Sequence, residues 1–167
     1  MSESHRAYLS LGSNIEPEKN LVKAIELLQN HGTIGKISSA WESKSVGAVA
    51  PNYLNACILF ITPLEQAELK EKILYPIEIK LGRRRSENRF APRTIDLDIV
   101  LFDDKCCDDK YWEQAFVVVP LAEIYPTFQN PIAHEPVNKT AARLLEKIWV
   151  EARPAVFAQL HRNNPQA

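Results

Sequence analysis

The sequence predicts a single α+β domain with a ferredoxin-like core, in which helices pack on a largely antiparallel sheet. The chain has 167 residues, a length typical of one domain, and 46% of them are hydrophobic, which is enough for a sizeable core. Segments of strand and helix character follow one another in the order β-α-β-β-α-β of ferredoxin-like folds. We expect strands at 7–11, 37–45, 53–62 and 93–102, and helices at 18–31 and 64–81.

The first four elements follow from periodicity and composition. Residues 7–11 (AYLSL) form a short strand that ends at Gly12. Residues 18–31 place apolar side chains at the spacing of one helix face. Residues 37–45 are expected to form one strand, and residues 53–62 (YLNACILFIT) are rich in the aromatic and β-branched side chains typical of strands.

The second helix, a basic loop and the last strand follow. Pro76 lies inside the helix expected at 64–81, so we expect a kink or an early end there. Residues 83–92 form a polar, basic loop before the final strand. Beyond that strand, residues 113–124 form a last packed segment, and residues 137–150 have a helical pattern. We find no repeat and no domain boundary, so we assign 1–167 to one domain and 127–167 to its C-terminal helical tail.

The composition excludes several classes of function. The net charge of −1 gives neither sign an excess, so we expect no nucleic-acid partner and no membrane binding. The three cysteines fit neither a disulfide framework nor a zinc-ligand spacing. The first residues lack the apolar run of a signal peptide, and no segment is apolar enough to span a membrane. We therefore expect a cytoplasmic protein.

The strand expected at 93–102 carries two aspartates, Asp96 and Asp98, among apolar residues. Residues two apart on a strand share a face, so these carboxylates lie about 7 Å apart at their Cα atoms, while Ile95, Leu97 and Ile99 face the core. Two adjacent carboxylates repel one another unless a cation or a shared proton offsets the charge. Arginine partners, one shared proton or a metal such as Mg²⁺ would do so, and a solvated strand face is the plain alternative.

Arginines crowd the loop that precedes these aspartates. Five of them occur within eleven residues, and Glu87 is the only acid there; they are Arg83, Arg84, Arg85, Arg89 and Arg93. The guanidinium fork suits phosphate oxygens, so arginines beside a carboxylate pair favour a Mg²⁺–polyphosphate site over a solvated loop. The sequence has neither GxxxxGK[ST] nor GxGxxG, and no evident set of residues for covalent catalysis.

Five motifs in order carry a resemblance to a known family. They are LGSN (11–14), YLNA (53–56), IEIKLGRRR (77–85), APRTIDLDIVLF (91–102) and AFVVVPLAEIYP (115–126). From about residue 7 to residue 126 the chain resembles hydroxymethyl-dihydropterin pyrophosphokinase, the folate-pathway enzyme that moves pyrophosphate from ATP to a pterin alcohol. The resemblance implies an α/β/α sandwich around a ferredoxin-like core, a monomer, and a site for ATP with two Mg²⁺ ions.

The resemblance also implies roles for individual residues. Asp96 and Asp98 match the two magnesium ligands, and Arg83 and Arg93 match catalytic, phosphate-contacting arginines. Glu78, Arg89 and Ile99 match further positions at the nucleotide. The pterin would be bound by Ser43, Val46, Tyr53, Asn55 and Phe116, with Asn55 on its edge and Phe116 on its face. No side chain is a clear general base; Asp96 is the nearest candidate, and metal polarisation of the hydroxyl could suffice.

The chain departs from the family in the nucleotide half. The loop after Phe102 is shorter and lacks the usual Pro-His-Pro segment, and Gln114 stands where the family has an arginine. Either other residues replace these nucleotide contacts, or turnover is weak. Two rival functions follow: a paralogue that binds a pterin or a partner protein with little or no kinase activity, and a transferase for a related alcohol.

Overall fold

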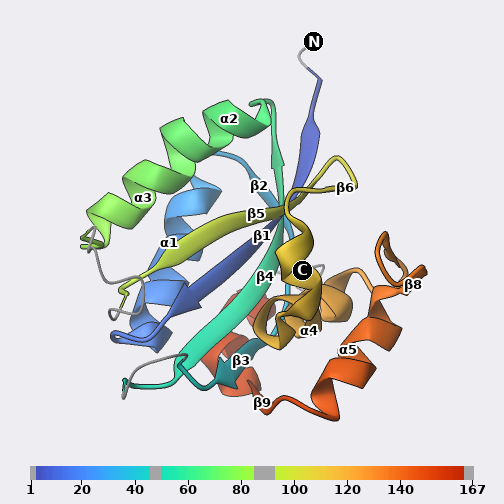
Figure 1. Cartoon of the computed structure of the whole chain (residues 1–167). Coiled ribbons are helices and arrows are strands. Elements are labelled where there is room, and N and C mark those ends of the chain that lie inside the picture. Colours follow the sequence, from blue (N-terminus) through green and yellow to red (C-terminus); the bar gives the residue numbers. More distant parts are fainter. Residues whose placement is uncertain (1–2, 46–49, 85–92, 164–167) are drawn as a thin grey trace.

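A seven-stranded sheet lies at the centre of the computed structural model, which describes residues 3–45, 50–84 and 93–163 (Figure 1). The strands run in the order β6-β5-β1-β4-β3-β9, with β2 also paired to β4, and all of these pairs are antiparallel. The strands are β1 (His5–Ser13), β2 (Thr33–Ile37), β3 (Ala40–Ser43), β4 (Tyr53–Thr62), β5 (Asp96–Phe102), β6 (Lys105–Cys106) and β9 (Val150–Arg153).

The ferredoxin-like prediction is confirmed by the order of the four core strands. β5, β1, β4 and β3 lie side by side, so the fourth core strand in the chain flanks the first, and the third lies between the first and the second. β1 is the central element: it pairs with β4 over its whole length and with β5 on its other edge.

The strand expected at 37–45 is confirmed in part: β3 lies inside this range, whereas β2 was not expected and overlaps the range only at Ile37. Both pair with β4, and the break falls at Ser38 and Ser39. The Ser38 hydroxyl accepts a hydrogen bond from the backbone N–H of Cys57 at 2.9 Å, and the Ser39 hydroxyl donates one to Glu123 at 2.7 Å. The Ser38 N–H also donates to the Cys57 carbonyl at 2.9 Å, so side-chain and backbone bonds together hold the break against β4. The local sequence pattern does not reveal these bonds.

Two long helical segments cover one face of the sheet (Figure 1). One is α1 (Pro17–Gln29), and the other joins α2 (Gln66–Leu69), a π-helical turn (Lys70–Leu74) and α3 (Tyr75–Lys80). Pro76 neither ends nor sharply breaks the second segment. Proline lacks an N–H donor, and the wider π turn directly before it lets the Tyr75 N–H bond to the carbonyl of Lys70.

The opposite face is covered by a 3₁₀ turn (Asp109–Glu113), α4 (Ala115–Ile124) and α5 (Val137–Leu145). The segment expected at 113–124 is thus a helix, and each face of the sheet has its own apolar core. Leu97 and Ile99 of β5 belong to the core under α1, whereas Tyr111 and Val117 belong to the core under α4. The structure is therefore a three-layer α/β/α sandwich, and none of its described helices is long and apolar enough to cross a membrane.

The C-terminal tail contains strands as well as helices. β7 (Gln129–Asn130) and β8 (Glu135–Pro136) form a hairpin, α5 ends at Leu145 rather than near 150, and β9 then pairs with β3 at the sheet edge. A 3₁₀ turn (Pro154–Phe157) and α6 (Ala158–Asn163) follow. Phe157 is fully buried in the core under α1, so the tail passes around the edge of the sheet from one face to the other.

Candidate active site

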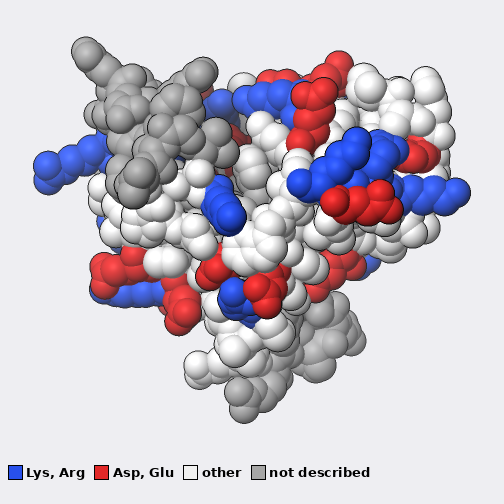
Figure 2. All heavy atoms as spheres, turned by 60° about the horizontal axis from the view of Figure 1, so that its bottom comes forward, with Lys and Arg blue, Asp and Glu red and all other residues white. Residues whose placement is uncertain are grey.

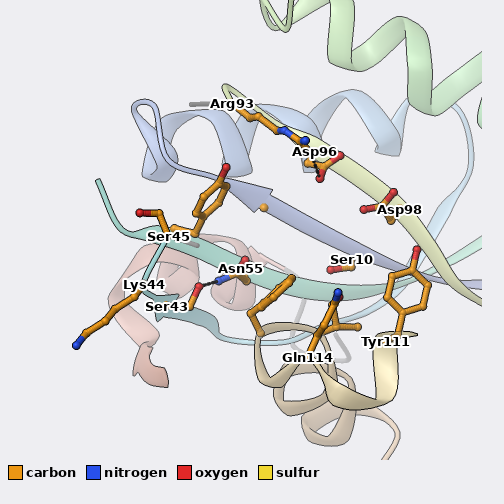
Figure 3. A pocket seen from close by; sticks show the side chains of 14 residues that line it. Ser10, Ser43, Lys44, Ser45, Asn55, Arg93, Asp96, Asp98, Tyr111 and Gln114 are labelled. Atoms are coloured by element: carbon orange, nitrogen blue, oxygen red, sulfur yellow. Dashed lines mark hydrogen bonds and ion pairs between the residues drawn. The ribbon is translucent and has the colours of Figure 1, made fainter. Parts of the chain in front are cut away.

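The two aspartates of β5 lie on one face of the strand, as its periodicity predicts. Asp96 and Asp98 are half-buried, whereas Leu97 and Ile99, which alternate with them along the strand, are buried. Figure 3 shows both carboxylates directed into a pocket from β5, with Tyr111 reaching toward the strand from the other side. The pair therefore lines a pocket rather than an open strand face.

Asp96 is held by two arginines. Its Oδ1 accepts a hydrogen bond from Arg83 at 2.9 Å, and its Oδ2 accepts one from Arg93 at 2.9 Å. Arg83 also pairs with Glu78, a buried carboxylate that accepts a 3.2 Å bond from the backbone N–H of Leu97. Glu78 thus caps part of the open edge of β5 and positions Arg83 at the same time.

Asp98 has a different environment. Within the described part of the chain no hydrogen bond or ion pair reaches its side chain, and burial together with the Asp96 charge raises its pKa to about 6. Lys110, Arg83 and Lys70 act in the opposite direction and lower this pKa. The Asp98 carboxylate has no ion-pair partner among the described residues, whereas Asp96 has two. A hard dication such as Mg²⁺ bound between the two aspartates would supply the missing positive charge. No third His, Cys, Asp or Glu joins the pair among the described residues, so a Mg²⁺ ion here would take its other ligands from substrate and water.

We expect Asp98 to make the metal-free protein less stable as the pH rises from about 4 to about 7. Its pKa in the folded state is about 6, above the ordinary value of 3.8. The unfolded chain therefore releases this proton first, and the free energy of unfolding falls across that window. A difference of about two pKa units corresponds to roughly 1–3 kcal/mol. Chemical denaturation in the presence of a chelator, at several pH values, measures the effect.

The matched variant for this measurement is Asp98→Asn, which has no charge to bury. Its stability should match that of the wild type near pH 4 and exceed it near neutral pH. Saturating Mg²⁺ should stabilise the wild type more than the variant. Identical pH profiles for the two proteins would contradict the unbalanced charge at Asp98.

Two cavities adjoin at the aspartates. The smaller, of about 180 Å³, is lined by Ser10, Gly12, Ser43, Lys44, Ser45, Tyr53, Asn55, Arg93, Asp96, Asp98, Tyr111, Gln114, Phe116 and Val117. The larger, of about 420 Å³, is lined by Lys70, Tyr75, Glu78, Ile79, Arg83, Arg93, Asp96, Leu97, Asp98, Lys110, Tyr111, Gln114 and Phe116. The carboxylate pair and Arg93 line both, so two ligands could meet there.

The smaller cavity suits a flat, polar ring. Asn55 of β4 is buried, and its amide N–H₂ donates to the Trp41 carbonyl at 3.1 Å. It also donates to the Ser43 hydroxyl at 2.7 Å (Figure 3). These bonds fix the amide, which leaves its oxygen beside Gly12. Phe116 adds an aromatic side chain, so edge hydrogen bonds and a ring contact are both available.

Gly12 lies between Asn55 and Asp96 in the register of the sheet. A Cβ at this position would lie 3.3 Å from the Asn55 amide oxygen and 3.8 Å from the Tyr53 ring. We expect Gly12→Ala to weaken ligand binding in the smaller cavity about tenfold, because the amide must shift, with little change in ATP-analogue binding. Calorimetry with each ligand tests this, and equal losses for both ligands would mean that the strand itself is distorted.

The larger cavity lies at the open edge of β5. β6 pairs only with Leu101 and Phe102 among the described residues, which leaves the first part of β5 without a second strand. The α2–α3 segment provides one wall and the 3₁₀ turn and α4 provide the other. Four basic side chains line this cavity, which suits a polyanion: Lys70, Arg83, Arg93 and Lys110.

Most of the residues proposed from the sequence converge on these cavities. They are Ser43, Tyr53, Asn55, Glu78, Arg83, Arg93, Asp96, Asp98 and Phe116. The Ile99 side chain lies in the core on the other face and lines neither cavity, so only its backbone could contact a nucleotide. Val46 and Arg89 lie outside the described residues.

The structure adds lining residues to which the sequence assigned no role. Ser10 and Gly12 are brought to the site because β1 pairs with β5, where Ser10 faces Asp98 and Gly12 faces Asp96. Tyr111 and Lys70 lie on helical turns that carry no motif. Gly12 falls within the LGSN motif, but only the register of β1 against β5 shows that Gly12 and Ser10 lie at the site.

The comparisons with known proteins agree with this geometry. The family model described as 7,8-dihydro-6-hydroxymethylpterin-pyrophosphokinase (HPPK) matches residues 8–126. Two relatives are named 2-amino-4-hydroxy-6-hydroxymethyldihydropteridine pyrophosphokinase. The one from Synechocystis sp. is 34% identical over 157 residues, covering 87% of this chain and 77% of that protein. The one from Bacillus subtilis is 40% identical over 130 residues, covering 71% and 77%.

Solved structures share the fold. The HPPK-DHPS protein of Plasmodium falciparum superposes with a TM-score of 0.65 at 10% identity, over 88% of this chain and 45% of that one. The chain thus spans less than half of the HPPK-DHPS chain in that structure. The family model covers more than two thirds of the sequence, and all residues that line the two cavities, the carboxylate pair included, lie within the matched range. The chain therefore belongs to the 7,8-dihydro-6-hydroxymethylpterin-pyrophosphokinase family.

Proposed function

We propose that this chain transfers pyrophosphate from ATP to 6-hydroxymethyl-7,8-dihydropterin, a step of folate biosynthesis, and releases AMP and the pterin diphosphate. Membership of the pyrophosphokinase family supports this function. The observation that links this function to particular residues is the pair of adjoining cavities, which share Asp96, Asp98 and Arg93 in their linings. One cavity suits a flat heterocycle and the other a polyanion, and the transferred group would pass between them.

The pterin would occupy the smaller cavity. Asn55 would bond to the polar edge of the ring and Phe116 would contact its face, while Ser43 holds the Asn55 amide in place. Tyr53 contributes to the wall beside Gly12. Losing the bonds of Asn55 would leave buried polar groups unmatched, at a cost of about 1–3 kcal/mol, which favours a ring with donors and acceptors on its edge.

ATP would occupy the larger cavity with its polyphosphate along β5. Arg83 and Arg93 now bond to Asp96, and phosphate oxygens would compete for both guanidinium groups. That exchange frees the Asp96 carboxylate, so Asp96 and Asp98 would hold Mg²⁺, two ions by family resemblance. The ions would neutralise the polyphosphate as the β-phosphorus is attacked. Glu78 keeps Arg83 near the phosphates throughout.

The hydroxyl proton of the pterin is released as its oxygen attacks. With ATP bound, Asp96 and Asp98 would both hold Mg²⁺, so neither carboxylate is a clear general base, and metal polarisation of the hydroxyl could suffice. Tyr111 stays protonated, because burial and the Asp98 charge raise its pKa. Transfer would therefore depend mainly on alignment and charge neutralisation.

The remaining expectations concern binding partners, oligomeric state and cellular location. On the face drawn in Figure 2, acidic and basic side chains lie next to one another, and neither sign forms an extended patch among the described residues. This supports small-molecule substrates rather than nucleic acid or a membrane surface. We further propose that the chain acts as a cytoplasmic monomer, which size-exclusion chromatography with light scattering would test.

The decisive experiment mixes the protein with ATP, Mg²⁺ and the pterin alcohol. Formation of AMP and of the pyrophosphorylated pterin in equal amounts supports the proposal. Pterin binding without AMP release would favour the binding paralogue instead. AMP release with another alcohol, but not with the pterin, would favour a related transferase. Each result distinguishes one function from the other two.

A further inference from the structure

Two lysines at the larger cavity have no role in the mechanism above. Lys70 lies on the π turn of the α2–α3 segment, and Lys110 lies on the 3₁₀ turn before α4. Both line the larger cavity, and neither lines the smaller one. They come from the two opposite helical layers and flank the open edge of β5 from its two sides.

The four cations surround the carboxylate pair from three directions. Arg83 and Arg93 bond to Asp96 from the segment that precedes β5, whereas Lys70 and Lys110 line the cavity from the two helical layers that flank the strand. A chain of phosphates lying along β5 would therefore meet guanidinium groups beside Asp96 and an ammonium group on each side. The two lysines double the number of positive charges that the arginines alone would supply.

The lysines are also available to a ligand. Lys110 has a 3.5 Å ion pair with Asp108, and its Nζ lies 5.4 Å from the centre of the Tyr111 ring. Both partners of the ion pair are about half exposed, and exposed contacts of these two kinds contribute about 0–1 kcal/mol each. Within the described ranges the structure gives Lys70 no ion pair at all. Arg83, by contrast, is already engaged by Glu78 and Asp96. An incoming polyanion can thus recruit the lysines at little cost in existing contacts.

From this arrangement we infer that Lys70 and Lys110 bind the polyphosphate of ATP from both sides of the β5 edge, and so complete the donor half of the site. The inference rests on the proposed function. It explains how the chain can bind a nucleotide although the loop after Phe102 is short and Gln114 contributes no charge. In that case the nucleotide half is rebuilt rather than lost.

The test compares cavity lysines with lysines close to them in the chain. Lys70→Gln, Lys110→Gln and the double variant are measured against two controls. Lys72→Gln removes a charge from the same π turn, where Lys72 pairs with Glu68, and Lys105→Gln removes an exposed charge on β6. Neither control residue lines a cavity. The probes are the non-hydrolysable α,β-methylene-ATP and AMP, titrated by calorimetry at fixed Mg²⁺ and at two salt concentrations.

Each cavity variant should bind α,β-methylene-ATP about three- to tenfold more weakly than the wild type, and the double variant more weakly still. AMP binding and thermal unfolding should be unchanged, because AMP lacks the phosphates concerned. Lys110→Arg should keep most of the affinity, and the double variant should show a weaker salt dependence.

Two outcomes would overturn the inference. One is a double variant that binds the analogue within twofold of the wild type. The other is an equal loss in the Lys72 or Lys105 control, which would mean that overall charge, not placement, determines affinity. A failure of the proposed function is distinguishable, because the wild type itself would then neither bind the analogue nor form the pyrophosphorylated pterin.

Discussion

Asp98→Asn and Asp96→Asn should each lower kcat on the order of 100-fold or more while the fold stays intact. Both substitutions keep the shape of the side chain and remove one negative charge where the two cavities meet. Loss of a group that stabilises charge in the transition state typically has an effect of this size. Steady-state turnover with ATP and the pterin alcohol, together with thermal unfolding of each variant, measures it.

Asp109→Asn is the matched control for these two variants. Asp109 is an exposed aspartate on the 3₁₀ turn and lines neither cavity, so its turnover should equal that of the wild type. Near-wild-type turnover in Asp98→Asn or Asp96→Asn would falsify the proposed role of that residue. Loss of folding in place of loss of turnover would assign the residue a structural role.

Arg93→Ala should weaken ATP-analogue binding about 10- to 100-fold and slow transfer, with a small effect on pterin binding. Arg93 donates to Asp96 and lines both cavities, and a charged hydrogen bond contributes about 1.5–3 kcal/mol. Arg93→Lys keeps the charge but loses the fork, so it should recover only part of the affinity. Calorimetry with each ligand separates the two effects.

Arg93 also has a structural role, because its backbone bonds to Asn14 at the end of β1. Its N–H donates to the Asn14 side chain at 2.8 Å, and its carbonyl accepts from the Asn14 N–H at 3.1 Å, so the residue also anchors the loop to β1. These bonds survive substitution of the side chain. An equal loss of affinity for both ligands would therefore argue that the guanidinium organises the loop. Arg84→Ala, at an exposed residue that lines neither cavity, controls for the general charge of the segment.

Features carried by a short stretch of chain could be predicted from the sequence. The alternation of β5 places Asp96 and Asp98 on one face with no knowledge of the rest of the fold. Likewise the order of strands and helices was sufficient for the ferredoxin-like core. The motifs around Arg83 and Asn55 located most of both cavities, because each motif is continuous in sequence.

Features that depend on distant parts of the chain could not be predicted. Gly12 and Ser10 reach the site only through the register between β1 and β5, which periodicity does not specify. The pairing of β9 with β3 joins segments more than 100 residues apart. Lys70 depends on a π turn, which shifts the side chains of the helix out of regular helical spacing. The strand break at Ser38 depends on a bond to Cys57 on a neighbouring strand.

The strand β9 has a consequence for how the chain is made and degraded. Val150 pairs with Ser43, a residue of the smaller cavity, so this wall is secured by the latest strand of the sheet to be synthesised. Until it emerges from the ribosome, β3 presents an unpaired edge, which is open to pairing with other chains. A protease that cuts between α5 and β9 would leave every catalytic side chain in place. It would nonetheless release the strand that supports Ser43, and we expect pterin binding to fail before ATP binding does.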